Sequence, residues 1–312
     1  MRRTTGDWVL LFFKGTAMGA ADAIPGVSGG TVAFISGIYQ ELLDSIRRIT
    51  PHALLLLGRQ GPRAFWKHIN GTFLLVLLSG VLLSLGSIAR LAIYLLEEHP
   101  TLLWAFFFGL IVSSSIWMMT QIKRWSSAPV IALWAGMVFA YLVTAISPVE
   151  VEATSLIVFG AGCIAICAMI LPGISGSFIL LLLGLYGPIM GAIKAFDLQI
   201  LALFMAGCAV GLLSFSHLLA WMFRHHHDLT LALLTGVMLG SLNRVWPWKY
   251  TTEYRINTRG DAVPLLQDNV LPVSYQALTG QDAMLWGALL LMLLGAVAVY
   301  MLERSGSIGK SD

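Results

Sequence analysis

Two short motifs combine proline, glycine and hydroxyl side chains in the same order, and they are the strongest candidates for a binding site. The first reads Ile24-Pro-Gly-Val-Ser-Gly-Gly-Thr and the second Leu171-Pro-Gly-Ile-Ser-Gly-Ser-Phe. Proline and glycine break a helix, and the helix that restarts after the break presents free amide N–H groups and the positive end of its dipole. Two such helix ends that converge inside the molecule predict an anion site.

The donors of this predicted site are amides and hydroxyl groups, and the glycines let a ligand approach the backbone. The alternative is that proline and glycine only permit a tight helical hairpin. Because serine is present in both copies, we favour the anion site. The predicted phosphate-binding residues of the two motifs are Gly26, Ser28, Gly29, Gly30, Thr31, Gly173, Ser175, Gly176 and Ser177.

Two ionisable residues lie within long apolar segments, where charge is costly and often functional. Arg90 lies about two turns inside one end of its segment, and it is a candidate counter-charge for a phosphate. Its alternative is snorkelling toward the lipid headgroups. His217 is the corresponding residue of the second half, and it could carry a proton or be a hydrogen-bonded core histidine.

The first motif region also carries charges that the second lacks, namely Lys14, Asp22 and Glu41. Asp22 stands beside the break and is the best candidate for proton coupling or for orienting Lys14. The alternative for Asp22 is a cap for the restarting helix, and for Glu41 a place in the headgroup zone. These residues make the two motif regions chemically unequal.

No cofactor or metal site is expected. Residues 224–228 read Arg-His-His-His-Asp, but they fall in a short turn with no converging ligands from elsewhere. Cys163, Cys167 and Cys208 lie in apolar segments without metal-ligand spacing, and we interpret them as small core residues.

The two motifs belong to a longer repeat. Residues 24–46 match residues 171–193 without a gap, including Gly37 and Tyr39 against Gly184 and Tyr186. A match of this length indicates duplication. The first half then has an insertion of about twenty residues, for which 50–70 is the natural place.

The composition predicts a chain that is embedded in lipid. Hydrophobic residues make up 57% of its 312 residues and charged residues 11%, whereas soluble domains carry roughly 25% charged residues. A net charge of +3 is too small to indicate a nucleic-acid partner. The expected fold is all-α, and six segments have the length of membrane spans, namely 69–96, 101–122, 127–146, 199–223, 229–247 and 283–303.

The motif regions 8–46 and 155–195 contain shorter apolar stretches, which predict two re-entrant broken helical hairpins. The first repeat would be 1–146, with a surface segment at 50–68. The second would be 155–303, with an outer loop at 248–282, before a tail at 304–312. Arginine and lysine fall on one side of the membrane under a single orientation, which predicts cytoplasmic termini and two halves of inverted topology.

The surface segment combines basic residues with Phe65 and Trp66, a composition that suits an anionic membrane interface.

The motifs resemble those of a known family. The stretch Met18-Gly-Ala-Ala-Asp-Ala-Ile-Pro-Gly-Val-Ser-Gly-Gly-Thr, then Gly37-Ile-Tyr-Gln-Glu-Leu, and the second motif are similar to the polyprenyl-phosphate transporters of the PopT type. The resemblance implies a multi-pass protein of the bacterial cytoplasmic membrane that is not an enzyme. It also implies movement of the lipid undecaprenyl phosphate from the outer to the inner leaflet, for peptidoglycan and other envelope polymers.

Two other functions stay open. Membrane undecaprenyl-diphosphate phosphatases have a similar Pro-Gly-x-Ser-Arg-Ser motif, but Gly29 stands here in place of the arginine, which would stabilise the transferring phosphoryl group. A channel or carrier for a small soluble anion is the second alternative, because helix ends bind such ions equally well.

Overall fold

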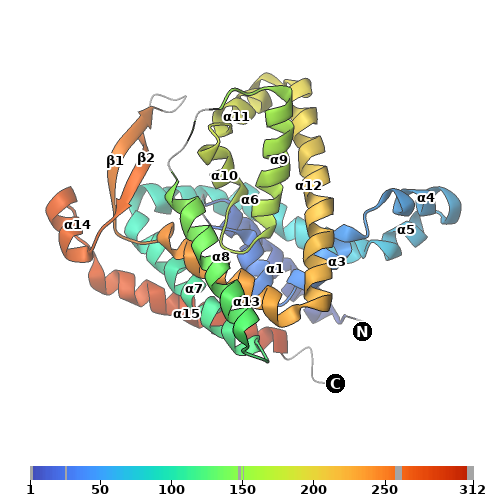
Figure 1. Cartoon of the computed structure of the whole chain (residues 1–312), viewed down its shortest axis with the longest axis horizontal. Helices are drawn as coiled ribbons and strands as arrows, with labels where there is room; N and C mark the ends of the chain where they lie inside the picture. Colours follow the sequence, from blue (N-terminus) through green and yellow to red (C-terminus); the bar gives the residue numbers. More distant parts are fainter. Residues whose placement is uncertain (1–2, 25–26, 147–148, 150, 257–261, 308–312) are drawn as a thin grey trace.

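The computed structural model describes residues 3–24, 27–146, 149, 151–256 and 262–307. This part of the chain is mostly helical and contains one two-stranded sheet (Figure 1). Three helices are long and apolar enough to cross a membrane, or up to five if each bent pair of helices counts as one span. The expectation of a helical membrane protein is therefore confirmed at this level.

The same order of elements occurs twice along the chain. The first series is α1 (Thr5–Asp22), α2 (Gly29–Ile35), α3 (Tyr39–Arg47), α4 (Pro51–Gln60), α5 (Pro62–His68), α6 (Gly71–Glu98), α7 (Pro100–Gln121) and α8 (Ser127–Ala145). The second series is α9 (Ser155–Ile170), α10 (Gly176–Leu182), α11 (Tyr186–Ala195), α12 (Leu198–His225), α13 (His227–Gly240), η1 (Ser241–Asn243), β1 (Lys249–Ile256), β2 (Ala262–Asn269), α14 (Pro272–Thr279) and α15 (Leu285–Ser307). Helices α4 and α5 have no counterpart in the second series and lie where the insertion was expected, and η1, β1, β2 and α14 have no counterpart in the first series.

Each motif interrupts a helix at the expected place. We call residues 23–28, between α1 and α2, the first break, and residues 171–175, between α9 and α10, the second break. The turns that follow α2 and α10 contain Gly37 (φ +73°) and Gly184 (φ +67°). Glycine adopts this left-handed conformation without the steric cost of a Cβ atom. Matched glycines thus form matched turns.

The helices pack in corresponding pairs. Helix α1 lies along α6, as α9 lies along α12, while α7 packs against α15 and α8 against α13. Gly80 of α6 and Gly207 of α12 let these backbones approach closely, because an added Cβ would lie 2.2 Å from Phe12 O and 2.0 Å from Phe159 O. Small residues at helix contacts are typical of membrane proteins, in which packing replaces the hydrophobic drive.

Helix α2 lies at the centre of the protein. All seven of its residues are buried, and the largest core cluster surrounds it with side chains from α1, α3, α6, α7, α12 and α13. A polar break beside such a helix must satisfy its backbone groups from the protein itself.

The segment after α13 departs from the sequence-based expectation. A span was expected over 229–247, but α13 ends at Gly240 and a short 3₁₀ helix follows. The region expected to be an outer loop contains the antiparallel hairpin of β1 and β2 and then α14. Pro247 cannot continue a helix, and the aromatic and β-branched residues that follow it favour strand structure. The hairpin and α14 lie on the left of Figure 1, on the opposite side from the two chain ends.

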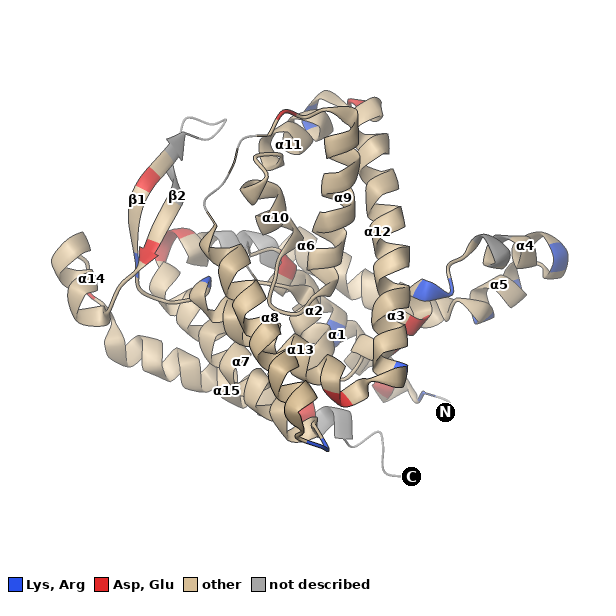
Figure 2. Ribbon diagram, viewed as in Figure 1, with Lys and Arg blue, Asp and Glu red and all other residues tan. Residues whose placement is uncertain are grey.

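The surface segment forms α4 and α5, which project away from the helical body (Figure 1). Arg59, Arg63, Trp66 and Lys67 are exposed there. Figure 2 shows that α8, α9, α12, α13 and α15 are free of lysine, arginine and acidic residues along most of their length. The charges gather at helix ends, on α4 and α5 and on the hairpin, which is the distribution that a lipid environment imposes.

Candidate functional site

The two breaks meet in the interior of the protein. The Ser28 hydroxyl lies 3.2 Å from Met169 O and 3.3 Å from Leu171 O, to which it donates. In return, the Gly173 amide donates to Thr31 Oγ1 at 2.8 Å. Residues about 140 positions apart in the sequence are therefore joined directly, and the expected convergence of the two motifs is present.

This contact is built on the carboxyl end of α9. The last carbonyl groups of any helix lack partners within that helix, and here the first motif region supplies them. Tyr39 is buried and its hydroxyl donates to Ile170 O at 3.0 Å. Gly30 is packed against the same carbonyl groups, and a Cβ at this position would lie 2.8 Å from Ile170 O. The site thus requires glycine at position 30.

Helix α2, which begins after the first break, is capped by nearby residues of the same motif region. Gly29 N donates to Asp22 Oδ1 at 2.7 Å, and Gly30 N donates to Ser28 Oγ at 3.1 Å. Thr31 N donates to Ser28 O at 3.0 Å. The amide donors that were expected to bind an anion at this break already have acceptors. Asp22 has the geometry of a cap, the alternative given for it above.

Helix α10, which begins after the second break, lacks such a cap. Ser175 begins it without a side-chain cap, and the Ser175 and Ser177 hydroxyls lie 2.8 Å from each other. Within the described part of the chain, the amides of Gly176, Ser177 and Phe178 have no acceptor. Ser175 and Gly176 are buried. Unpaired donors away from water cost free energy until an acceptor reaches them, so this break can receive an anion.

Two of the predicted site residues fall outside the described structure. Gly26 lies in a stretch whose placement is not described, and the same holds for the side chain of Arg90 in α6. The structure therefore places neither of them relative to the breaks.

The charged residues of the first motif region are placed, and they do not pair with one another as suggested. Lys14 is buried and donates to Ser36 O at 2.7 Å, so its partner is a backbone carbonyl group of the same region and not Asp22. Glu41 forms an ion pair with Arg3 and accepts from Asn70 Nδ2 at 2.9 Å. It ties the start of the chain to α3 and α6.

His217 lies away from the breaks. Its side chain is exposed on α12, and its Nδ1 atom lies 2.7 Å from Leu213 O of the preceding turn. This position is neither a core site nor part of the converging motifs.

Arg244 and Lys249 are two cations that were not among the residues predicted for the site. The Arg244 guanidinium lies 4.7 Å from the ring centroid of Phe178, in the first turn of α10. Lys249 Nζ lies 4.1 Å from the ring centroid of Trp104 and donates to Arg244 O. The sequence does place these two cations next to several aromatic residues. The segment that follows α13 carries charges of both signs, however, and for this reason its cations were not assigned a role.

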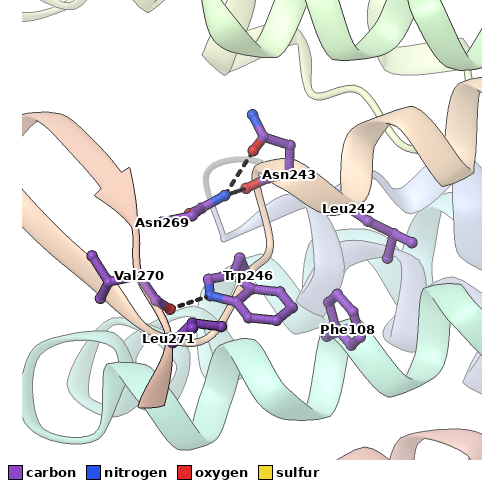
Figure 3. Close-up of a pocket in the computed structure, with 7 residues that line it drawn as sticks. All are labelled: Phe108, Leu242, Asn243, Trp246, Asn269, Val270 and Leu271. Carbon is purple, nitrogen blue, oxygen red and sulfur yellow. Dashed lines mark hydrogen bonds between the residues drawn. The ribbon is translucent and has the colours of Figure 1, made fainter. Parts of the chain in front are cut away.

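A pocket of about 400 Å³ lies beside these residues and not between the breaks. Figure 3 shows it between α7 and the segment that joins η1 to the hairpin. The lining residues carry no charge and are Phe108, Leu242, Asn243, Trp246, Asn269, Val270 and Leu271. Trp246 Nε1 donates to Val270 O at 2.9 Å, which fixes one wall. Its lining suits an apolar group better than a phosphate.

The described residues contain no group of three or more histidine, cysteine or acidic side chains that could hold a metal ion. Within the histidine tract, Asp228 accepts from Arg124 N at 3.0 Å and joins the α7–α8 connection to α13. Cys163 donates to Gly207 O in the contact between α9 and α12.

Comparison with known proteins gives concordant matches. The chain matches a family model described as undecaprenyl phosphate translocase-like over residues 18–263. A polyprenyl-phosphate transporter of Vibrio cholerae is 49% identical over 304 residues, which cover 97% of this chain and 99% of the relative. A polyprenyl-phosphate transporter of Staphylococcus aureus is 35% identical over 261 residues, which cover 77% of this chain and 86% of the relative. No solved structure gives a significant match.

Proposed function

The chain belongs to the undecaprenyl phosphate translocase-like family, and from this premise we propose that it moves undecaprenyl phosphate from the outer to the inner leaflet of the cytoplasmic membrane. The names of its relatives point to a polyprenyl-phosphate cargo. Return of this lipid carrier would serve the synthesis of peptidoglycan and other envelope polymers. In this account the protein is a transporter and carries out no covalent chemistry.

The proposed topology is an inverted repeat with both termini in the cytoplasm. The matched order of elements and the matched packing of α1 with α6 and of α9 with α12 support it. The positive-inside distribution of charge gives the orientation. Under this orientation the first break is reached from the cytoplasm and the second from outside, while α4 and α5 lie on the inner membrane surface.

The headgroup site is proposed at the second break, and one observation carries this choice. The amides at the start of α2 are occupied by Asp22 and Ser28, whereas those at the start of α10 are free in the described structure. A phosphate monoester offers several strong acceptor oxygens, which suit free amides and the hydroxyls of Ser175 and Ser177. Because this break faces outward in the proposed topology, it would receive the lipid from the outer leaflet.

The prenyl chain would stay in the lipid while the headgroup passes between the halves. For this to happen, the contact between the two breaks must rearrange, since Ser28 and Thr31 join them directly. Rocking of one half against the other is the motion typical of inverted-repeat transporters. The hydrogen bonds between the breaks would then belong to one of the two end states.

The phosphatase alternative receives no support from the first break. Gly29 replaces the arginine of the phosphatase motif, and a Cβ at this position would lie 2.4 Å from Asp22 Oδ2. A long cationic side chain therefore has no room there, and the phosphoryl group would lack its charge stabiliser.

The test is leaflet exchange in liposomes that contain the purified protein and a fluorescent undecaprenyl phosphate. We expect the wild type to exchange the lipid phosphate faster than protein-free liposomes, and the double variant Ser175→Ala/Ser177→Ala to be at least tenfold slower. Ser79→Ala is the control, because Ser79 is exposed and its hydroxyl donates to Val76 O of its own helix. No exchange by folded wild-type protein would contradict the function, and unchanged exchange by the double variant would contradict the site.

A further inference from the structure

Arg244 and Lys249 are two half-buried cations without an acidic partner among the described residues. Among the described residues, no carboxylate oxygen lies within the 4.0 Å ion-pair distance of either side chain. The Nε atom of Arg244 is buried and has no hydrogen-bond acceptor in the part of the chain that the structure describes. Burial, and secondarily the charge of Arg244, lower the pKa of the Lys249 ammonium well below its usual range. The described residues therefore leave the Arg244 guanidinium group, which stays charged, without a counter-charge.

Aromatic rings are the visible compensation for these charges. Arg244 faces Phe178 and Lys249 faces Trp104. A cation over an aromatic ring gains less free energy than the burial of an unpaired ion costs. An arrangement of this kind is unfavourable for stability alone, but it attracts an anionic ligand that can approach the cations.

The segment that carries Arg244 is fixed on the second break by two independent contacts. Gly173 adopts φ +93°, and a Cβ there would lie 2.7 Å from Ser241 Oγ and 3.1 Å from Met238 Cα, so η1 lies directly against the break. Three residues after Ser241 along the chain, Arg244 covers the ring of Phe178. The cation therefore lies at the helix start that has the free amide donors.

We propose that Arg244 binds the phosphate group of the transported lipid at the second break, with Lys249 adding positive potential beside it. This inference rests on the proposed transport function and names a residue that recognises the headgroup. A guanidinium group offers five donors in a planar fork and binds phosphate oxygens in pairs. Its unpaired Nε is one donor that the ligand would satisfy.

The assignment also explains the long excursion between α13 and α15. The hairpin holds Lys249 against Trp104 of α7 and against the carbonyl group of Arg244. In the proposed topology this segment lies on the outer side of the membrane. It would therefore place a cation at the second break on the side from which the lipid phosphate enters.

The test compares Arg244→Met, Arg244→Lys and the control Arg224→Met. Arg224 is exposed at the end of α12 and donates to Ala220 O, so its replacement removes the same charge far from η1. Thermal unfolding of detergent-purified protein is followed with undecaprenyl phosphate, with undecaprenol and with inorganic phosphate. The midpoint without ligand measures stability, and the increase with ligand measures binding.

We expect undecaprenyl phosphate, but not undecaprenol, to raise the midpoint of the wild type and of Arg224→Met. Arg244→Met should need at least tenfold more lipid phosphate for the same increase, and Arg244→Lys should fall between the two. Without ligand, the midpoint of Arg244→Met should not decrease, because a half-buried charge without an acidic partner and its unpaired Nε atom have been removed.

The failures of the two proposals are distinguishable. If Arg244→Met unfolds at a lower temperature but keeps the full response to lipid phosphate, Arg244 is structural and the inference is wrong. Equal loss in Arg224→Met would also overturn it. Inorganic phosphate separates the headgroup from the lipid. If it raises the midpoint of the wild type as much as undecaprenyl phosphate does, the proposed lipid cargo is contradicted. If Arg244→Met then loses the response to inorganic phosphate, the assignment of Arg244 as a phosphate-binding residue is still supported.

Discussion

Replacement of Gly30 by alanine adds one methyl group at the point where the two breaks touch. The new Cβ would lie 2.8 Å from Ile170 O and 2.9 Å from Met169 O, where ordinary contacts begin at 3.4 Å. Both atoms belong to the backbone at the end of α9, so they cannot swing aside as a flexible side chain would. The breaks must therefore separate by about half an ångström.

The expected cost follows from two effects. Overpacking of a tight interior costs about 1–3 kcal/mol, and stretching the bonds from Ser28 to Met169 and Leu171 costs about 1 kcal/mol more. We expect Gly30→Ala to be destabilised by about 2–4 kcal/mol, and to lose transport because the contact between the breaks no longer closes.

The measurement is unfolding in detergent followed by tryptophan fluorescence, together with leaflet exchange in liposomes. The matched control is Gly191→Ala, because Gly191 is exposed in α11 and a Cβ there would have no neighbour within 4 Å. Alanine in a helix should leave Gly191→Ala as stable as the wild type or slightly more so. If Gly30→Ala unfolds and transports like Gly191→Ala, the two breaks do not form the contact described here.

Two further predictions concern the first motif region. Asp22→Asn should keep nearly full stability, because an amide oxygen can still accept from Gly29 N. Asp22→Ala should lose about 1 kcal/mol of stability in detergent unfolding. Equal loss in both variants would mean that the charge of Asp22 matters beyond capping. Glu41→Ala should lower stability by about 0.5 kcal/mol, because it removes the ion pair with Arg3. The control is Glu98→Ala, which removes an exposed carboxylate and should leave stability unchanged. Equal unfolding midpoints of the two variants would contradict a stabilising role for the ion pair.

The sequence predicted the breaks and the repeat because both depend on local chemistry. Proline and glycine interrupt a helix wherever they occur, and the matched Gly37 and Gly184 adopt the same left-handed turn. The helical class followed from composition and segment length. Such features require only neighbouring residues to be known.

Which donors stay free could not be predicted, because it depends on contacts between distant residues. Nothing near Ser28 in the sequence indicates that its hydroxyl donates to Met169 O and Leu171 O. The same holds for Arg244, whose place over Phe178 depends on where α13 ends and how η1 packs. Two motifs of nearly equal sequence therefore differ in their free donors, since the amides of the first have internal acceptors and those of the second do not in the described structure.

Amide hydrogen exchange tests this difference most directly. Exchange at residues 176–178 and at 29–31 would be compared in the purified protein with and without undecaprenyl phosphate. We predict that the lipid phosphate slows exchange at 176–178 and leaves 29–31 unchanged, because the amides of 29–31 have acceptors in the described structure and those of 176–178 do not. Protection confined to 29–31, or none at either break when binding is saturated, would contradict the proposed headgroup site.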